Sequence, residues 1–416
     1  MSHNTDSLSR RAQRMLAGQA TPEYLVRHFE GSANPYDPES NPEGYIGLCV
    51  AENKLVAGLV ADRLDRVGAV PPEVLGYDAM TGSLRFREQL ARFMGRTFLG
   101  RRFDPHQISV LAGAGSVLEI LFHALGDPGD GVLVPTPSYA GFWMDLELRN
   151  GLAIVPIHRA ADDGFRLTPE LLDCAVADAD RPIKALLYTS PDNPLGTVAA
   201  AEEVERVAAW AADRNLHLVV DEIYALSVFG ERPFTSVAQV LPSLGEHVHI
   251  VWAFSKDFGA SGLRCGVLVS ENPAVNAAVD GLAYWACCSG HTQHLLGEVI
   301  SDDAWVDGYV ASMRMLLGGA YDRVAEALKA AGIPFVPAEA GFFVLLDLRS
   351  FLSEPTWEAE HSLWLRILAE ARVNLTPGAS CHVGEPGFFR LCYAGLPTPA
   401  VEAGVGRIAT LSSRSG

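Results

Sequence analysis

Lysine is scarce in this 416-residue sequence. It occurs only at Lys54, Lys184, Lys256 and Lys329, among 32 basic residues. Any reaction that depends on a lysine amine therefore has four candidates. Lys329 lies in the helix-like segment EALKAAG, where a solvated helix face is expected, and Lys184 precedes a strand-like run. Lys256 and, behind it, Lys54 remain as the candidates for chemistry.

Long apolar runs and cysteine pairs are also missing. No stretch approaches the roughly 20 apolar residues that a membrane-spanning helix needs. The opening MSHNTDSLSRRAQRML has no apolar signal core. The seven cysteines form no CxxC pair, so they predict neither a zinc site nor a disulfide framework. We therefore expect a cytoplasmic protein that binds no metal.

The sequence also has no excess of positive charge. The 50 acidic and 32 basic residues give a formal charge of −18. Nucleic acids and anionic membranes both attract basic surfaces, so neither is an expected partner. The length exceeds that of one ordinary domain, and 49 % hydrophobic residues are enough for a sizeable core. One large α/β domain with a smaller one fits these values.

Helix-like and strand-like segments alternate along most of the chain. The first 40 residues are polar and carry Pro35, Pro38 and Pro42, which indicates an arm without regular structure. Helical periodicity is found near 83–98, 116–125, 201–213 and 292–331. Short apolar runs typical of strands occupy 131–135, 152–157, 183–188, 216–220, 248–254, 266–269, 342–347 and 388–393.

This alternation predicts a buried and mostly parallel sheet sandwiched by helices. We expect a large domain over residues 55–295. A smaller α+β domain is expected from both termini, with residues 1–54 supplying an arm and part of it and residues 296–416 the remainder.

The segment VWAFSKDFGASGLRCG (251–266) places Lys256 after a strand and Arg264 beyond a glycine-rich turn. A lysine at a strand end can be held close to a ligand. An arginine eight residues later can bind a phosphate through two parallel hydrogen bonds. Taken alone, the motif is also compatible with an ordinary surface lysine.

The segment HLVVDEIY (217–224) ends an apolar strand in Asp221, with Tyr224 three residues later. Open α/β sheets bind ligands at the carboxyl ends of their strands. A buried aspartate that faces a pyridine nitrogen keeps this nitrogen protonated, and Tyr224 could donate to a phenolic oxygen on the same ring. A helix N-cap and a packing tyrosine are the alternative.

Four further motifs follow strand-like or loop segments. Asn193 lies in the proline-bracketed turn TSPDNPLGT (189–197), Tyr139 in VPTPSYAGF (134–142) and Arg390 in the apolar EPGFFRLCY (385–393). The loop LAGAGSVLEI (111–120) opens a helix, so its free N–H groups face any phosphate. Taken alone, Asn193 is compatible with a plain turn, Tyr139 with a core aromatic and Arg390 with a buried ion pair. The loop 111–120 is compatible with a common helix start. Together they occur in one order at strand ends, which makes coincidence a poor explanation.

In this order the motifs resemble the fold type I enzymes of the class I/II aminotransferases, which use pyridoxal 5′-phosphate (PLP). The similarity is greatest to their 1-aminocyclopropane-1-carboxylate (ACC) synthase branch. It covers nearly the whole chain beyond residue 35 and is carried by NPEGYIGLCVAENKL (41–55), DPGDGVLVPTPSYAGF (127–142), SPDNPLGT (190–197), HLVVDEIYALSVF (217–229), FSKDFGASGLRCG (254–266), SGHTQHLL (289–296), FFVLLDLR (342–349) and NLTPGASCHVGEPGFFRLCYA (374–394).

The resemblance implies a role for each matching residue. Lys256 would hold PLP as a Schiff base and remove the α-proton of the substrate, and Asp221 would pair with the ring nitrogen. The other implied cofactor ligands are Asn193 and Tyr224 at the phenolic oxygen, Tyr139 stacked on the ring, and Gly113, Ala114, Gly115, Ser116, Ser255 and Arg264 around the phosphate.

Two further roles concern the substrate and a second copy of the chain. Arg390 would bind the substrate carboxylate, and Glu52 would lie near the sulfonium of S-adenosylmethionine (SAM), with Tyr139 beside the substrate. Tyr77 would reach the phosphate and substrate of a neighbouring subunit, which implies a homodimer. A carboxylate near a sulfonium cation is physically reasonable.

The sequence also departs from the family pattern. Ala253 and Gly115 replace a hydroxyl residue and a threonine that commonly contact the phosphate, and Ser261 replaces a frequent proline. The segment after Tyr77, DAMTG, is closer to aminotransferase spacing, and AYWACCSGH (283–291) is unusually aromatic.

Several reactions therefore remain open. The first is ACC synthesis from SAM, with ring closure at Cγ. The second is loss of methylthioadenosine by γ-elimination, followed by capture of the intermediate at Cγ by a second small-molecule substrate. The third is transamination between an amino acid and a keto acid. A non-catalytic regulator with this fold is a fourth alternative, although the sequence has no basic N-terminal domain that would bind DNA.

Overall fold

The computed structural model describes residues 5–17 and 21–412. A seven-stranded sheet has the order β2-β8-β7-β6-β5-β3-β4. Its strands are β2 (Ile108–Leu111), β3 (Gly131–Thr136), β4 (Ala153–His158), β5 (Ile183–Thr189), β6 (His217–Asp221), β7 (Val248–Ala253) and β8 (Gly266–Ser270). Only β8 runs antiparallel to its neighbours. The predicted mostly parallel sheet is confirmed, and the sequence reading overlooked β2, which is only four residues long.

Two hydrophobic cores cover the two faces of this sheet. Because successive side chains of a strand point to opposite faces, Leu186 belongs to one core and Leu187 to the other. The Leu187 core is closed by α5 (Ala114–Leu125), α6 (Phe142–Glu147) and α11 (Pro273–Leu282). The Leu186 core is closed by α4 (Leu84–Met94), α7 (Pro169–Asp178), α8 (Ala201–Asp213) and α13 (Asp303–Ala330).

A second, three-stranded antiparallel sheet has the order β11-β12-β9. Its strands are β9 (Phe343–Asp347), β11 (Thr376–Pro377) and β12 (Phe388–Cys392). Near it, β1 (Ile46–Gly47) pairs in parallel with β10 (Val373–Asn374). This pairing joins segments more than 300 residues apart, so both ends of the chain contribute to this part of the molecule.

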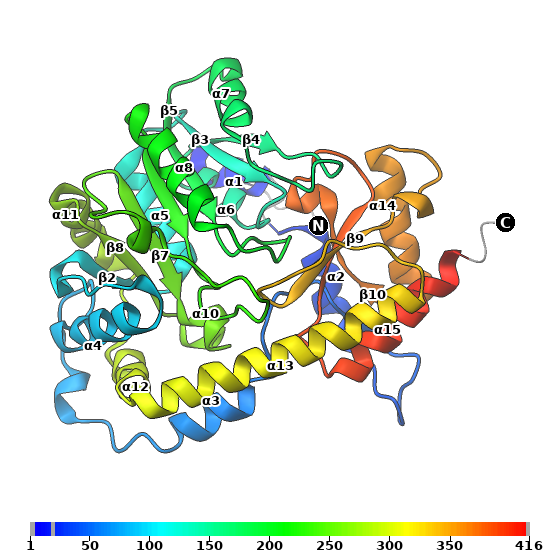
Figure 1. The fold of residues 1–416 in the computed structure, drawn as a ribbon, viewed down its shortest axis with the longest axis horizontal. Coiled ribbons are helices and arrows are strands. Elements are labelled where there is room, and N and C mark those ends of the chain that lie inside the picture. Colours follow the sequence, from blue (N-terminus) through cyan, green and yellow to red (C-terminus); the bar gives the residue numbers. More distant parts are fainter. Residues whose placement is uncertain (1–4, 18–20, 413–416) are drawn as a thin grey trace.

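The helix expected near 292–331 is interrupted. It consists of α12 (Gly290–Ile300) and α13, and Asp302 ends the gap by accepting a hydrogen bond from the Trp305 N–H at 3.0 Å. An aspartate at an N-cap starts a new helix, which explains the break. The helix α13 then runs from the seven-stranded sheet to α15 (Thr398–Ser412) (Figure 1). The predicted domain boundary between 295 and 296 falls inside α12.

The polar N-terminal region is more regular than expected. It contains α1 (Arg10–Ala17) and α2 (Glu23–Gly31), both of which precede the prolines at 35, 38 and 42. Tyr24 is buried, and its carbonyl accepts a hydrogen bond from Asn374 Nδ2 at 2.9 Å. The second helix therefore packs onto the region of β10, a contact that local sequence cannot reveal.

The remaining helices are short. The helix expected over 83–98 begins at Leu84 and passes into a π-helical turn over Gly95–Leu99. The others are α3 (Ala57–Leu64), α9 (Val237–Val240), α10 (Phe254–Asp257) and α14 (Trp357–Arg366). Within the described residues, no helix has the length and apolar character needed to cross a bilayer.

Candidate active site

A cavity of about 240 Å³ lies at the carboxyl ends of β5, β6 and β7, where α5 and α10 begin. This is the edge at which such sheets bind ligands. Nine residues singled out in the sequence line it, namely Ala114, Gly115, Tyr139, Asn193, Asp221, Tyr224, Ser255, Lys256 and Arg264. Segments separated by up to 150 residues thus converge on one cavity.

Lys256 lies in α10, one turn after the end of β7. Its Nζ donates a hydrogen bond to the Ala51 carbonyl at 2.7 Å. Burial, and secondly the positive charge of Arg390, lower the pKa of the Lys256 amine to about 8. A substantial fraction of this amine is therefore neutral near physiological pH and able to attack a carbonyl group. None of the other three lysines lines the cavity.

Asp221 ends β6 with its side chain in the cavity. One carboxylate oxygen accepts a hydrogen bond from the Ile223 N–H at 3.2 Å. Burial raises the pKa of Asp221 to about 7. A cation placed opposite this carboxylate would restore its ionised form, because opposite charges in a buried site stabilise each other. The site is therefore suited to a positively charged ring nitrogen.

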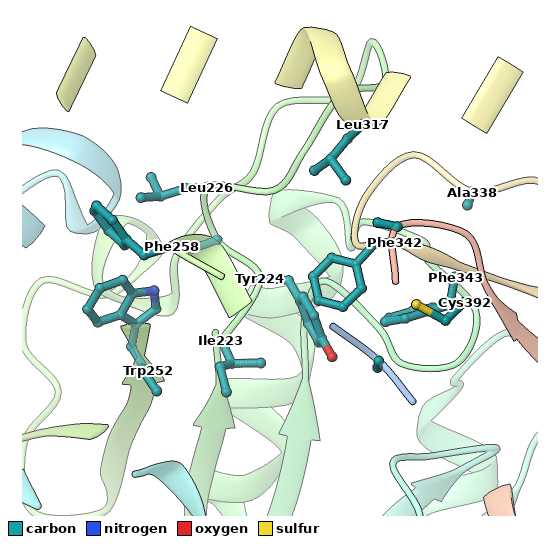
Figure 2. Close-up of a cluster of buried hydrophobic side chains, with 14 of the residues drawn as sticks. Ile223, Tyr224, Leu226, Trp252, Phe258, Leu317, Ala338, Phe342, Phe343 and Cys392 are labelled. Carbon is teal, nitrogen blue, oxygen red and sulfur yellow. The ribbon is translucent and has the colours of Figure 1, made fainter. Parts of the chain in front are cut away.

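Tyr224 and Asn193 hold one side of the cavity. Asn193 Nδ2 donates to the Tyr224 hydroxyl at 3.3 Å. The Tyr224 ring is fixed by edge-to-face contacts with Phe342 and Phe343 (Figure 2). Since the ring is locked by packing, its hydroxyl keeps one position beside Asn193. These two side chains can serve a single ligand oxygen together.

Arg390 lies behind Asn193 and does not line the cavity itself. Its guanidinium donates to Asn193 Oδ1 at 3.1 Å, to the Cys49 carbonyl at 2.7 Å and to Thr376 Oγ1 at 3.1 Å. The side chain is buried, its Nε lacks a partner, and no carboxylate in the described part of the chain pairs with it. A buried cation without an anion is costly. The structural ion pair considered as its alternative role is therefore not present.

Backbone groups dominate the opposite end of the cavity. Gly113 has a φ of +98°, and α5 begins at the next residue. The first N–H groups of a helix have no acceptor within it, and Ala114 and Gly115 of this first turn line the cavity. The Arg264 guanidinium packs on Gly113 so closely that an added Cβ would collide with it. Ser116 lies one residue beyond the cavity lining, and its hydroxyl donates to the Ala112 carbonyl at 3.3 Å.

Tyr139 forms part of the cavity wall and is 38 % exposed. Its ring makes an edge-to-face contact with Phe142 at a centroid distance of 5.4 Å. The loop that carries it is braced by Arg159, which donates to the Pro137 carbonyl at 2.7 Å and pairs with Asp192 at 2.9 Å. Arg159 thereby connects the Tyr139 loop to the turn of Asn193.

Glu52 and Tyr77 lie outside the cavity lining. Glu52 is paired with Lys54 at 3.4 Å and accepts a hydrogen bond from Ser261, which does line the cavity, at 3.5 Å. Tyr77 is fully exposed at 101 %. A tyrosine in this position contributes nothing to the cavity of its own chain.

Several cavity residues were not singled out in the sequence, namely Leu118, Phe142, Asp145, Thr189 and Ile223. Ser261, noted there only as a departure from the family pattern, also lines the cavity. Asp145 is the most polar of them. Burial, and secondly the charge of Glu119, raise the pKa of its carboxyl to about 6. Residues three or four apart share one helix face, and Asp145 lies three residues after Phe142. This spacing could have indicated that both side chains point to the same cavity.

Residues 45–408 match the family model for aminotransferase class I and II. The chain belongs to this family. It is 36 % identical to 1-aminocyclopropane-1-carboxylate synthase 7 of Arabidopsis thaliana, over 98 % of this chain and 95 % of that protein. It is 35 % identical to 1-aminocyclopropane-1-carboxylate synthase 4 of Oryza sativa subsp. japonica, over 97 % of this chain and 89 % of that protein.

Solved structures show the same fold. An aspartate aminotransferase variant of Thermus thermophilus superposes with a TM-score of 0.81 at 24 % identity, covering 97 % of this chain and 99 % of the other. The aspartate aminotransferase of Thermotoga maritima gives a TM-score of 0.80 at 24 % identity, with the same coverage. The predicted PLP-transferase fold is confirmed. The chain is a PLP-dependent enzyme, which excludes the alternative of a non-catalytic regulator.

The cavity fits PLP in its own chemistry. A lysine amine of lowered pKa suits the aldehyde, and a buried carboxylate suits the ring nitrogen. The Asn193–Tyr224 pair suits the phenolic oxygen, and the start of α5 with Arg264 suits the phosphate. Each polar group of the cofactor therefore has a chemically complementary partner among the residues at this one cavity.

Proposed function

We propose that this enzyme converts SAM into ACC and methylthioadenosine. The observation that carries this proposal is the similarity to ACC synthases, at 35–36 % identity over almost the entire chain. The likeness to aspartate aminotransferases is lower, at 24 % identity, and supports the fold alone.

Lys256 performs the proton transfer in this proposal. When bound, PLP withdraws electrons from the Cα of the amino acid joined to it. Lys256 would hold the cofactor as a Schiff base, and its amine would accept the Cα proton of the substrate. The electron pair left on Cα forms the bond to Cγ, and the Cγ–S bond breaks with its electrons moving to sulfur. The sulfonium thereby leaves as neutral methylthioadenosine, and the three-membered ring closes.

Arg390 and Glu52 position the substrate. The unpaired guanidinium of Arg390 binds the α-carboxylate, which supplies the anion that this buried cation lacks. Glu52 reaches the cavity through Ser261 and places negative charge on the side of the sulfonium. Its ion pair with Lys54 is half exposed, so solvent screens it and a bound sulfonium can compete for the carboxylate.

The remaining predicted residues hold the cofactor. Asp221 pairs with the ring nitrogen, Asn193 and Tyr224 bind the phenolic oxygen, and Tyr139 stacks on the ring. The phosphate is bound by Gly113, Ala114, Gly115, Ser116, Ser255 and Arg264. We propose that Tyr77 completes the phosphate site of a second copy in a homodimer, because its full exposure leaves it without a role in its own chain.

The test mixes purified holoenzyme with SAM and identifies the products by mass spectrometry. Equal amounts of methylthioadenosine and ACC are expected. Methylthioadenosine without ACC would overturn ring closure and assign the γ-elimination reaction with an external nucleophile. No methylthioadenosine, together with conversion of the cofactor to its amine form by a common amino acid, would assign the enzyme to transamination.

A further inference from the structure

Asp145 is a cavity residue without a partner. It lies in α6 and faces the same cavity as Lys256 and Arg264. Neither of its carboxyl oxygens forms a hydrogen bond or an ion pair within residues 5–17 and 21–412. The carboxyl group is partly exposed in the cavity, so its oxygens are free to bind a ligand there.

Gly115 provides the room for this carboxyl group. A Cβ added at Gly115 would lie 3.0 Å from Asp145 Oδ1, closer than most real Cβ contacts. Gly115 is the second residue of α5, in the turn whose free N–H groups point into the cavity. Asp145 Oδ1 thus lies where a side chain at position 115 would be. A ligand bound to the N–H groups of this turn would be within reach of that oxygen.

Hydroxyl donors are few at this end of the cavity. The Ser116 hydroxyl is engaged with the Ala112 carbonyl, and that of Ser261 is directed to Glu52. Two Arg264 nitrogens donate to the Ser261 and Ala112 carbonyls, at 3.0 and 3.3 Å. Ser255 is the one remaining serine among the residues that line the cavity. Free side-chain hydroxyl donors are therefore few at this end, so a further donor would add to phosphate binding by the backbone N–H groups and Arg264.

We propose that Asp145 is a cofactor-binding residue whose protonated carboxyl group donates a hydrogen bond to the phosphate of PLP. The oxygen beside Gly115 supplies the donor that a hydroxyl side chain at position 115 would otherwise provide. A carboxylic acid bound to a phosphate oxygen makes a charge-assisted hydrogen bond, which is short and strong. Ionised Asp145 would instead repel the phosphate.

The surrounding charges favour the protonated form. Glu119 from α5 and Asp221 from β6 both act on Asp145 as like charges. Tyr139 faces it from the loop after β3. Arg264 and Lys256 line the same cavity as cations and oppose this effect. The bound phosphate adds further negative charge and raises the pKa of the carboxyl above its value of about 6 without the cofactor.

The test compares PLP release from holoenzymes carrying Asp145→Ala and Asp145→Asn with release from the wild type. Loss of the visible absorbance of bound PLP after dilution gives the rate. At pH 7, Asp145→Ala should release PLP roughly tenfold faster, because one hydrogen bond to a charged group is lost. Asp145→Asn keeps an N–H donor and should stay within about threefold of the wild type.

The pH dependence separates a donor from a structural role. Release from the wild type should accelerate as the pH rises and Asp145 ionises, whereas Asp145→Asn should not show this step. Adding Gly115→Thr to Asp145→Ala should restore slow release through the new hydroxyl. Release from Asp145→Ala that is unchanged or slower, or an identical pH profile in Asp145→Asn, would overturn the proposal. These readouts use PLP alone, so they are independent of whether SAM is the substrate.

Discussion

The two ends of the cofactor cavity are built in different ways. At the end proposed to bind the ring, side chains from distant segments form a network. Hydrogen bonds link Arg390, Asn193 and Tyr224, and the Tyr224 ring packs against Phe342 and Phe343. At the phosphate end, the backbone at the start of α5 and one arginine predominate.

This contrast indicates how the two ends tolerate change. A side-chain network fails when one member is removed, because its buried partners lose their hydrogen bonds. A site made from backbone N–H groups survives many substitutions, because each residue supplies the same group. The ring end is therefore expected to determine the chemistry, and the phosphate end to adjust how firmly the cofactor is held.

The largest effect is expected for Lys256→Ala, the residue between the two ends. The variant should lose the visible absorbance of the covalently held cofactor, and its turnover should fall by about 10³-fold or more, since nucleophile and base are removed together. Absorbance spectra and single-turnover assays measure both. Lys184→Ala, at the exposed start of β5, is the matched control. A retained absorbance band would assign the linkage to another lysine, with Lys54 the first to examine.

Arg390→Lys tests the ring end. It keeps the positive charge but loses the planar fork that donates to Asn193 and Thr376 and that would bind the carboxylate in the proposed reaction. We expect KM for the amino acid to rise by roughly 10- to 100-fold, with a smaller change in kcat. Arg349→Lys, whose exposed pair with Asp347 lies outside the cavity, serves as the comparison. An unchanged KM would remove Arg390 from the substrate site.

The pKa of Lys256 predicts a pH dependence for capture of PLP by the cofactor-free protein. Only the neutral amine attacks the aldehyde, and the neutral fraction grows as pH rises through about 8. The second-order rate of capture, followed by absorbance, should therefore increase roughly tenfold from pH 6 to pH 7 and level off above pH 8. A rate that is flat from pH 6 to pH 9 would show that the amine is already neutral or that another step limits capture.

Tyr77→Phe should have the smallest effect, because in the proposed dimer it would remove only one hydroxyl from a phosphate site dominated by backbone groups. Release of PLP should become about threefold to tenfold faster, and the protein should remain a dimer by light scattering. Mixed dimers that pair Tyr77→Phe with Lys256→Ala subunits give a sharper result. If Tyr77 serves the partner, both changes fall in one site and the other site is intact. If Tyr77 serves its own chain, the only site that keeps Lys256 carries the Tyr77→Phe change. A monomer that turns over at full rate would contradict the shared site.

The sequence was sufficient to predict the strands that carry the site. Asp221, Asn193 and Lys256 follow apolar runs, and a parallel sheet brings the ends of such runs together, so their convergence could be inferred. The resemblance to a known family supplied their roles. Two strands of the three-stranded sheet, β9 and β12, were also predicted, whereas the two-residue β11 was not.

Other features depend on contacts that a sequence pattern does not contain. The short β2 has too few residues for a periodic signal, and α2 is stabilised by a hydrogen bond to Asn374, about 350 residues away. The break between α12 and α13 required recognition of Asp302 as a cap within an otherwise continuous helical pattern. Asp145 gains its position from Gly115 in another helix, so neither residue identifies the other.

The pairing of β1 with β10 also has a consequence for how the enzyme is made. The segment that follows β1 supplies the Ala51 carbonyl to Lys256 and the Cys49 carbonyl to Arg390. A chain emerging from the ribosome exposes this segment early, yet β10 and Arg390 are synthesised more than 300 residues later. The proposed active site can therefore be completed only when synthesis is nearly finished, and a chain truncated before residue 373 would carry Lys256 without Arg390, the proposed substrate-binding residue.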